Sequence, residues 1–248
     1  MNLWRVELAR LLRTNRWMLL AGVFATFGLL GPLSARYLGE IIARFGGEIE
    51  VTFPDPKPID GIAQFAANWS QLGVLAVVIV AASALAIDAR PEISAFYRTR
   101  VENAWQVVAP RYWVPLAASA LSLIVGTFMA VIATEILIGP LDTVGVALGT
   151  GLAVIYLGFL VALVAAISTF TAGTTTTIFA ALATAIAIPA VGLIAAVEPW
   201  LPSELVGAAM DLASDAEPLD FLRSTVSALA STTLLLRVAV LRIDRREI

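Results

Sequence analysis

The residues best suited to specific polar contacts lie between residues 88 and 111, where carboxylates alternate with arginines. The candidates for docking a partner are Asp88, Arg90, Glu92, Arg98, Arg100 and Glu102. Mixed charges of this kind can complement a partner surface and fix its orientation. The alternative is a solvated loop whose arginines only set membrane topology. From the residues alone, the topological interpretation is favoured.

The groups that usually carry catalysis are missing from the sequence. It has no histidine and no cysteine, which removes the commonest general base, the thiolate nucleophile and the commonest metal ligands. The only lysine, Lys57, stands between two prolines, so the sequence has no Walker A loop whose lysine could reach a phosphate. A Gly-x-Ser-x-Gly nucleophile motif is also absent. We expect no enzyme activity, no cofactor and no metal, although carboxylate metal sites stay open in principle.

The ionisable residues that qualify as lying inside the apolar blocks are Glu135, Arg223 and Arg237, while Arg242 stands at the very end of the sixth block. Charged groups at membrane depth are costly and often functional. Each of the three lies near the end of its block, where a long side chain can reach the interface. The sequence therefore argues against a proton or ion relay.

Composition places the chain in a membrane. Hydrophobic residues make up 59% of it and charged residues 14%, with a mean hydropathy of +0.88. A soluble domain has about 25% charged residues. The net charge of −3 argues against a nucleic-acid partner. The partner that this composition requires is the lipid bilayer.

Six apolar blocks have the length of about 20 residues that a membrane-spanning helix needs. They are Trp17–Ala35, Ser70–Ile87, Tyr112–Ile138, Thr143–Ile167, Thr176–Val197 and Phe221–Ile243. A Gly139-Pro140 turn separates the third and fourth blocks. The polar run Ser168–Thr177 either separates the fourth and fifth blocks or breaks one long helix, and their joint length favours two crossings. The predicted fold is all-α and polytopic, a single domain over residues 1–248, with a membrane region over 17–243 and a tail over 244–248.

The arginines predict the orientation. They gather before the first block, after the second and after the sixth, while the loop from Glu198 to Asp220 has no basic residue. Basic loops stay in the cytoplasm. We therefore expect both termini in the cytoplasm and an even number of spans.

Residues 1–16 are expected to form a cytoplasmic, amphipathic helix at the membrane interface. Trp4, Leu8, Leu11 and Leu12 share one face at helical spacing. Glu7 and the four arginines occupy the rest of the helix, which suits a helix lying among headgroups. Two interpretations stay open: a flank that only enforces topology, and a helix that also receives a partner.

Two further amphipathic regions lie outside the blocks. Residues Arg36–Phe45 carry an apolar stripe and alternating charges at four-residue spacing, which favours a helix. The loop after the fifth block has apolar residues beside Pro199 and Pro202, which predicts short re-entrant or interfacial helices.

One family shares this layout. A Pro-rich segment at Pro54–Pro58 precedes a Gln-x-x-x-Asn-x-x-Gln pattern formed by Gln64, Asn68 and Gln71, and the charged loop with Asp88 and Arg90 follows the second block. In these features, and in its N-terminal helix and six blocks, the chain resembles the permease subunit of an ABC transporter of the type-2 exporter family. It departs from the family at Glu92-Ile93, where Gly-Thr is usual, and at Val101, where proline is usual.

The resemblance implies a function. It implies a permease of the prokaryotic plasma membrane, paired with a second permease as a homodimer or heterodimer and energised by a separate ATP-binding subunit. With the resemblance, docking of a partner becomes the favoured interpretation of the charged loop, in place of a role in topology alone. The rival hypothesis is a non-transporting assembly or anchoring protein on the same scaffold. The resemblance transfers no substrate-binding residues.

Overall fold

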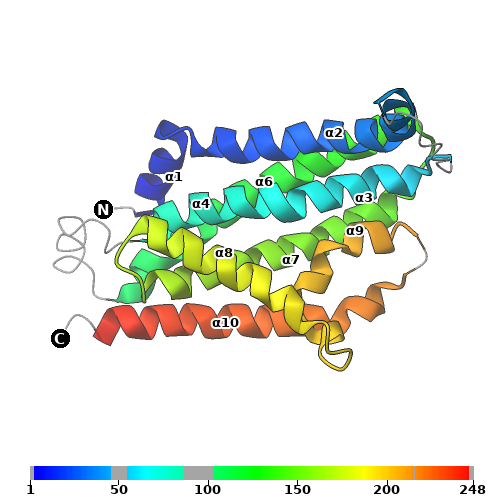
Figure 1. The fold of residues 1–248 in the computed structure, drawn as a ribbon. Helices are drawn as coiled ribbons and strands as arrows, with labels where there is room; N and C mark the ends of the chain where they lie inside the picture. Colours follow the sequence, from blue (N-terminus) through cyan, green and yellow to red (C-terminus); the bar gives the residue numbers. More distant parts are fainter. Residues whose placement is uncertain (1–2, 46–54, 87–102, 215, 246–248) are drawn as a thin grey trace.

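The computed structural model describes residues 3–45, 55–86, 103–214 and 216–245 (Figure 1). Every regular element in these ranges is helical. The long helices are α2 (Arg16–Phe45), α3 (Pro58–Asn68) with α4 (Val74–Leu85), α6 (Ala104–Leu137), α7 (Thr143–Ser168), α8 (Thr174–Val191) and α10 (Leu222–Arg245). Counting α3 and α4 as one run, the described chain has six helices long and apolar enough to cross a membrane. The predicted all-α, six-span architecture is confirmed.

The ends of several spans differ from the prediction. The second begins at Pro58 rather than Ser70, the third begins at Ala104 rather than Tyr112, and the fifth ends at Val191 rather than Val197. The predicted helix Arg36–Phe45 is the continuation of α2. The polar run after α7 separates two helices, as expected. Prolines inside α2 and α6 do not end these helices, because neighbouring helices in a membrane bundle stabilise the interrupted turns.

The two ends of the bundle carry different elements. One end, here called the terminal end, holds α1 (Leu3–Arg13), the last turn of α4, the first turns of α6, the turn 169–173 and the last turn of α10 (Figure 1). Both described chain ends therefore lie on one side, as an even number of spans requires. The arginines of these elements are Arg5, Arg10, Arg13, Arg111, Arg242 and Arg245.

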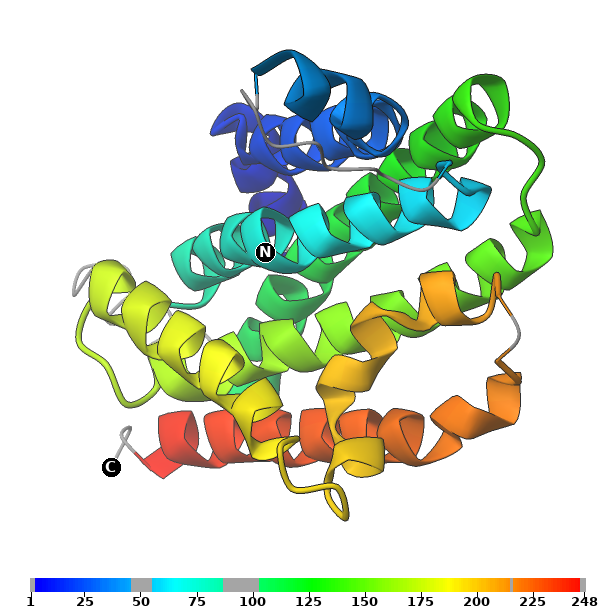
Figure 2. The same ribbon diagram turned by 45° about the vertical axis from the view of Figure 1, so that its right-hand side comes forward.

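Helix α7 lies in the centre of the bundle (Figure 2). It packs against α4, α6, α8, α9 (Ala208–Asp211) and α10 and is the most buried of the six spans, whereas α8 and α10 are the least buried. The outer faces of α8 and α10 are apolar, with Phe179, Ile186 and Leu234 exposed. Such faces suit contact with lipid tails rather than with water.

Small residues allow a close contact between α2 and α6. A Cβ atom on Gly126 would lie only 2.7 Å from the carbonyl oxygen of Phe24, and a Cβ on Gly28 would overlap the carbonyl of Gly126. Membrane helices associate through small residues that let backbones approach. The glycines therefore fix where these two helices cross.

Four aromatic rings connect α2, the second span and α7. The π-helical turn Trp69–Gly73 joins α3 to α4 and buries Trp69. The Trp69 ring centroid lies 6.2 Å from that of Phe24 and 6.5 Å from that of Tyr156, which in turn lies 6.2 Å from Phe159. Offset and edge contacts at this spacing add to the burial energy of the rings.

Short helices fill the segment between α8 and α10, as the sequence predicted. They are η3 (Glu198–Trp200), η4 (Pro202–Val206), α9 (Ala208–Asp211) and η5 (Pro218–Phe221). Both η4 and α9 fold back against α7, and Leu205, Ala208 and Leu212 are buried there. Figure 1 shows α9 beside the α7 half that lies away from the terminal end.

Candidate functional site

The N-terminal helix α1 runs across the direction of α2 at the terminal end (Figure 1). The chain turns between them at Asn15, whose φ of 53° is the left-handed conformation that asparagine tolerates. The Thr14 hydroxyl donates to the carbonyl of Arg10 at 2.7 Å and closes the last turn of α1. The predicted N-terminal helix is present, and its position at the membrane interface stays a prediction.

Glu7 departs from its expected place on the polar face of α1. Its side chain is only 5% exposed, and it forms two ion pairs. The Nε of Arg111 donates to Oε1 of Glu7 at 3.0 Å, and Nη2 of Arg10 lies 3.0 Å from Oε2. A buried carboxylate is tolerated when cations and hydrogen bonds satisfy it in this way.

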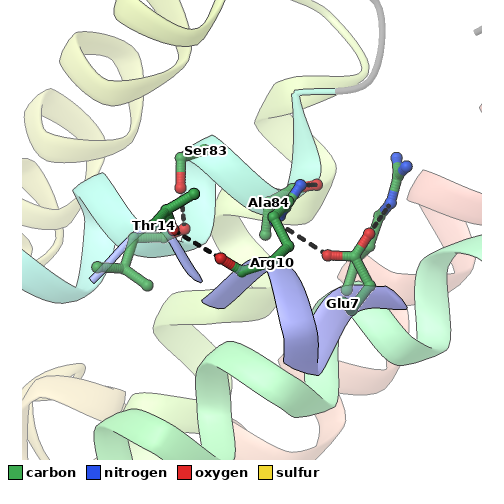
Figure 3. Close-up of polar contacts among 7 residues, drawn as sticks. Glu7, Arg10, Thr14, Ser83 and Ala84 are labelled. Carbon is green, nitrogen blue, oxygen red and sulfur yellow. Dashed lines mark hydrogen bonds and ion pairs between the residues drawn. The ribbon is translucent and has the colours of Figure 1, made fainter. Parts of the chain in front are cut away.

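Arg10 extends the network to α4. Its Nη1 donates to the carbonyl of Ala84 at 3.5 Å, in the last turn of α4 (Figure 3). Arg111 belongs to α6, so one carboxylate connects α1 with the ends of two spans. We define Glu7, Arg10 and Arg111 as the ionic junction.

Arg111 does not lie in the charged loop that was predicted between residues 88 and 111, and that prediction is wrong for this residue. α6 begins at Ala104, where the Asn103 side chain accepts from the backbone N–H of Trp105 at 2.9 Å and caps the helix. Arg111 is therefore two turns inside α6, and its side chain is 5% exposed. It forms part of the helix packing rather than of a solvated surface.

The predicted docking residues Asp88, Arg90, Glu92, Arg98, Arg100 and Glu102 lie outside the described residues. The structure describes the helices on either side of them. α4 ends at Leu85 beside Arg10, and the backbone N–H of Ala104 donates to Oδ1 of Asp244 at 3.3 Å. The two helix ends that flank the segment are thus attached to α1 and to α10.

The last turn of α10 also holds the turn between α7 and α8. The Nε of Arg242 donates to the carbonyl of Thr169 at 3.3 Å, and its guanidinium carbon lies 3.9 Å from the Phe170 ring centroid. Contact of a guanidinium with an aromatic face is attractive. The terminal end is therefore one connected polar assembly.

The three ionisable residues of the apolar blocks lie apart from this assembly. Glu135 is exposed in the last turn of α6, and Arg223 in the first turn of α10 lies 5.9 Å from the Trp200 ring centroid. Arg237 is exposed on α10, two turns before its end. In the described part of the chain, no group of three or more carboxylates could hold a metal ion.

Carboxylates gather in the folded-back segment at the opposite end. Burial raises the pKa of Glu204 above its ordinary value, and the charges of Glu198 and Asp211 raise it further. Burial also raises the pKa of Asp211. The folded segment therefore binds protons more tightly than the unfolded chain does.

This pKa pattern predicts that the segment packs on α7 more stably in acid. With a raised folded-state pKa, the stability is fully present below the ordinary pKa and is lost as the pH rises through the raised value. Backbone amides of residues 202–212 should exchange more slowly at pH about 4 than at pH about 8, after correction for intrinsic exchange. Glu204→Gln should reduce this difference, and an unchanged difference would contradict the assignment.

Comparison with protein-family models, curated proteins and solved structures finds no match to this chain. The class of protein is therefore argued from the fold alone. Six long apolar helices with a docked amphipathic helix constitute an all-α, multi-pass architecture. An architecture of this kind suits a membrane, since its apolar outer faces need a non-aqueous surrounding.

Proposed function

We propose that this chain is the membrane-spanning permease subunit of an ATP-driven exporter. It acts in the prokaryotic plasma membrane, with both termini in the cytoplasm and a second permease beside it as a homodimer or heterodimer. A separate ATPase subunit docks on residues 88–102. The chain itself contributes no catalysis, since its only lysine is held between prolines and reaches no nucleotide phosphate.

The ionic junction is the observation that best supports this proposal. Residues 88–102 join α4 to α6, so a partner seated there displaces the ends of both helices. Arg10 and Arg111 connect these ends to α1 through the same carboxylate. Nucleotide-driven movement of the partner would then shift three helices together, as rigid packed elements do.

The arginine distribution supports the proposed orientation. The described terminal end carries arginine on α1, α6 and α10, while the folded-back segment at the other end carries Glu198, Glu204 and Asp211. Basic flanks remain cytoplasmic. An ATPase in the cytoplasm would meet the terminal end.

A crosslinking experiment tests the proposal. A photo-crosslinking amino acid at Arg98 should capture, in cells, a protein that contains a Walker A loop, identified by mass spectrometry. The same amino acid at Trp200, exposed at the opposite end of the bundle, is the matched control and should not capture it. Capture from both positions, or of no nucleotide-binding protein, would instead favour the non-transporting assembly protein.

Charge reversal at Arg98 and Arg100 should weaken the complex. Interfacial charge pairs couple by roughly 1.5–7 kcal/mol, so the Arg98→Glu/Arg100→Glu pair should lower the affinity for the captured ATPase by about tenfold or more. The ATPase stimulation by this chain should fall in parallel. Arg245→Glu, on the exposed last turn of α10, controls for lost positive charge, and topology is verified in each variant. Normal stimulation by the Glu pair would mean that these arginines only set topology.

A further inference from the structure

A groove of about 750 Å³ lies between α1, the first turns of α2 and the stretch of α6 from Trp113 to Val125. Its lining includes Trp4 and Leu8 of α1, Trp17 of α2, and Trp113 and Leu121 of α6. All five of these side chains are exposed. The volume falls in the range of about 300–1,000 Å³ that is common for small-molecule sites.

The residues that line the groove favour a hydrocarbon ligand. The lining is almost entirely apolar: beyond the indole N–H groups of its three tryptophans, its one polar side chain is Ser122, whose hydroxyl donates to the carbonyl of Ala118 at 2.8 Å. A polar occupant would therefore replace few of the hydrogen bonds that it makes to water. The occupant that fits is an alkyl chain.

The aromatic residues of the groove favour a position at a membrane interface. It contains three of the six tryptophans of the chain, Trp4, Trp17 and Trp113. Tryptophan concentrates where headgroups meet acyl chains. Helix α1 runs across the direction of α2 (Figure 1), and the apolar stripe of α1 lines the groove through Trp4, Leu8, Leu11 and Leu12.

The arginines of α1 favour a lipid with an anionic headgroup. Arg5 and Arg13 are exposed on α1, which carries the apolar stripe of the groove. The one carboxylate of α1, Glu7, is buried and paired with Arg10 and Arg111. The exposed side of α1 therefore presents positive charge beside an apolar groove, and an anionic headgroup complements it.

We propose that the groove binds an anionic phospholipid, with an acyl chain along α2 and α6 and the phosphate beside Arg5 and Arg13. The inference goes beyond the proposed transport function and does not depend on it. The same lipid would hold α1 against the bundle, since it contacts both.

Quenching of tryptophan fluorescence by brominated lipids tests the site. The full chain is placed in phosphatidylcholine vesicles that contain either brominated phosphatidylglycerol or brominated phosphatidylcholine at equal mole fraction. One variant keeps Trp113 alone and another keeps Trp105 alone, with the other five tryptophans replaced by phenylalanine. Trp105 is the matched control, because it is also exposed on α6 but does not line the groove.

Brominated phosphatidylglycerol should quench Trp113 more strongly than brominated phosphatidylcholine does, by about fivefold for each contributing arginine. The double variant Arg5→Gln/Arg13→Gln should bring the ratio of quenching by the two lipids close to one. Quenching by brominated phosphatidylcholine should persist in this variant, which shows that the groove has formed. Trp105 should show little preference. Ala117→Phe, which fills the groove, should reduce quenching of Trp113 by both lipids.

Three results would overturn the proposal. The first is equal quenching of Trp113 by both lipids, and the second is a preference for phosphatidylglycerol that survives the loss of both arginines. The third is no quenching by either lipid, which is the result expected if a second copy of the chain covers the groove. Native mass spectrometry of the unsubstituted chain gives an independent measurement. From mixed vesicles, the chain should retain phosphatidylglycerol over phosphatidylcholine, and the arginine variant should not.

Discussion

Replacing Glu7 with alanine is expected to lower the free energy of unfolding by about 3–5 kcal/mol. The Glu7 and Arg111 side chains are each 5% exposed, so the change leaves the guanidinium of Arg111 buried without its carboxylate. The loss comes from keeping the guanidinium buried without the Glu7 carboxylate, more than from the attraction between the two groups. Unfolding of the purified chain in mild detergent, followed by circular dichroism, measures it.

The exposed pair of Arg36 and Glu40 provides the matched control. Its charged groups are 3.7 Å apart, and the Glu40 side chain is 64% exposed. Glu40→Ala should therefore cost about 0–1 kcal/mol. Glu7→Leu combined with Arg111→Met should cost less than the sum of the single changes, because an apolar pair leaves no buried charge. Equal, small effects of Glu7→Ala and Glu40→Ala would contradict a buried junction.

Gly149→Ala is expected to destabilise the bundle by about 1–3 kcal/mol. A Cβ atom at this position would overlap the backbone of Ala208 and Ala209, so the folded-back segment would have to move away from α7. Overlap with backbone is more costly than overlap with the end of a flexible side chain, since backbone cannot rotate aside. The effect should appear in thermal unfolding and as faster amide exchange over residues 202–212.

Gly151 gives a control on the same helix. A Cβ atom there meets nothing within 4 Å. Gly151→Ala should therefore be neutral or stabilise α7 by about 0.5–1 kcal/mol, because alanine loses less backbone entropy than glycine in a helix. Of the two alanine variants, only Gly149→Ala should lower the melting temperature. A similar shift in both would mean that α9 does not pack on α7.

Hydropathy alone predicted the six spans, because a bilayer imposes a minimum apolar length that composition reveals. It missed the start of the second span, since Asp60, Gln64 and Asn68 interrupt the apolar run. The helix begins earlier because Pro58 suits a first helical turn and the Asp60 carboxylate accepts from the backbone N–H of Lys57 at 2.8 Å. This local capping is readable from sequence, but it is weaker than the apolar signal beside it.

The ionic junction was not predicted, because its partners are 104 residues apart. No periodicity connects residues at that separation, and the chain has to fold before they meet. One sign was present: Glu7 is the only acidic residue before Glu40, and it lies four residues before the buried Leu11. A lone carboxylate at the edge of an apolar stripe is a candidate for a buried, paired group.

The order of synthesis makes the junction a late event in assembly. Glu7 leaves the ribosome first, and Arg111 follows 104 residues later, which takes about 5–20 s at the usual 5–20 residues per second. During that interval Glu7 lacks the guanidinium of α6 and stays solvated, because burying a carboxylate without full pairing is costly. We therefore expect helix α1 to remain at the membrane surface and to dock on the bundle only after the third span has emerged. A chain stalled before Arg111 would keep its N-terminal helix open to a protease.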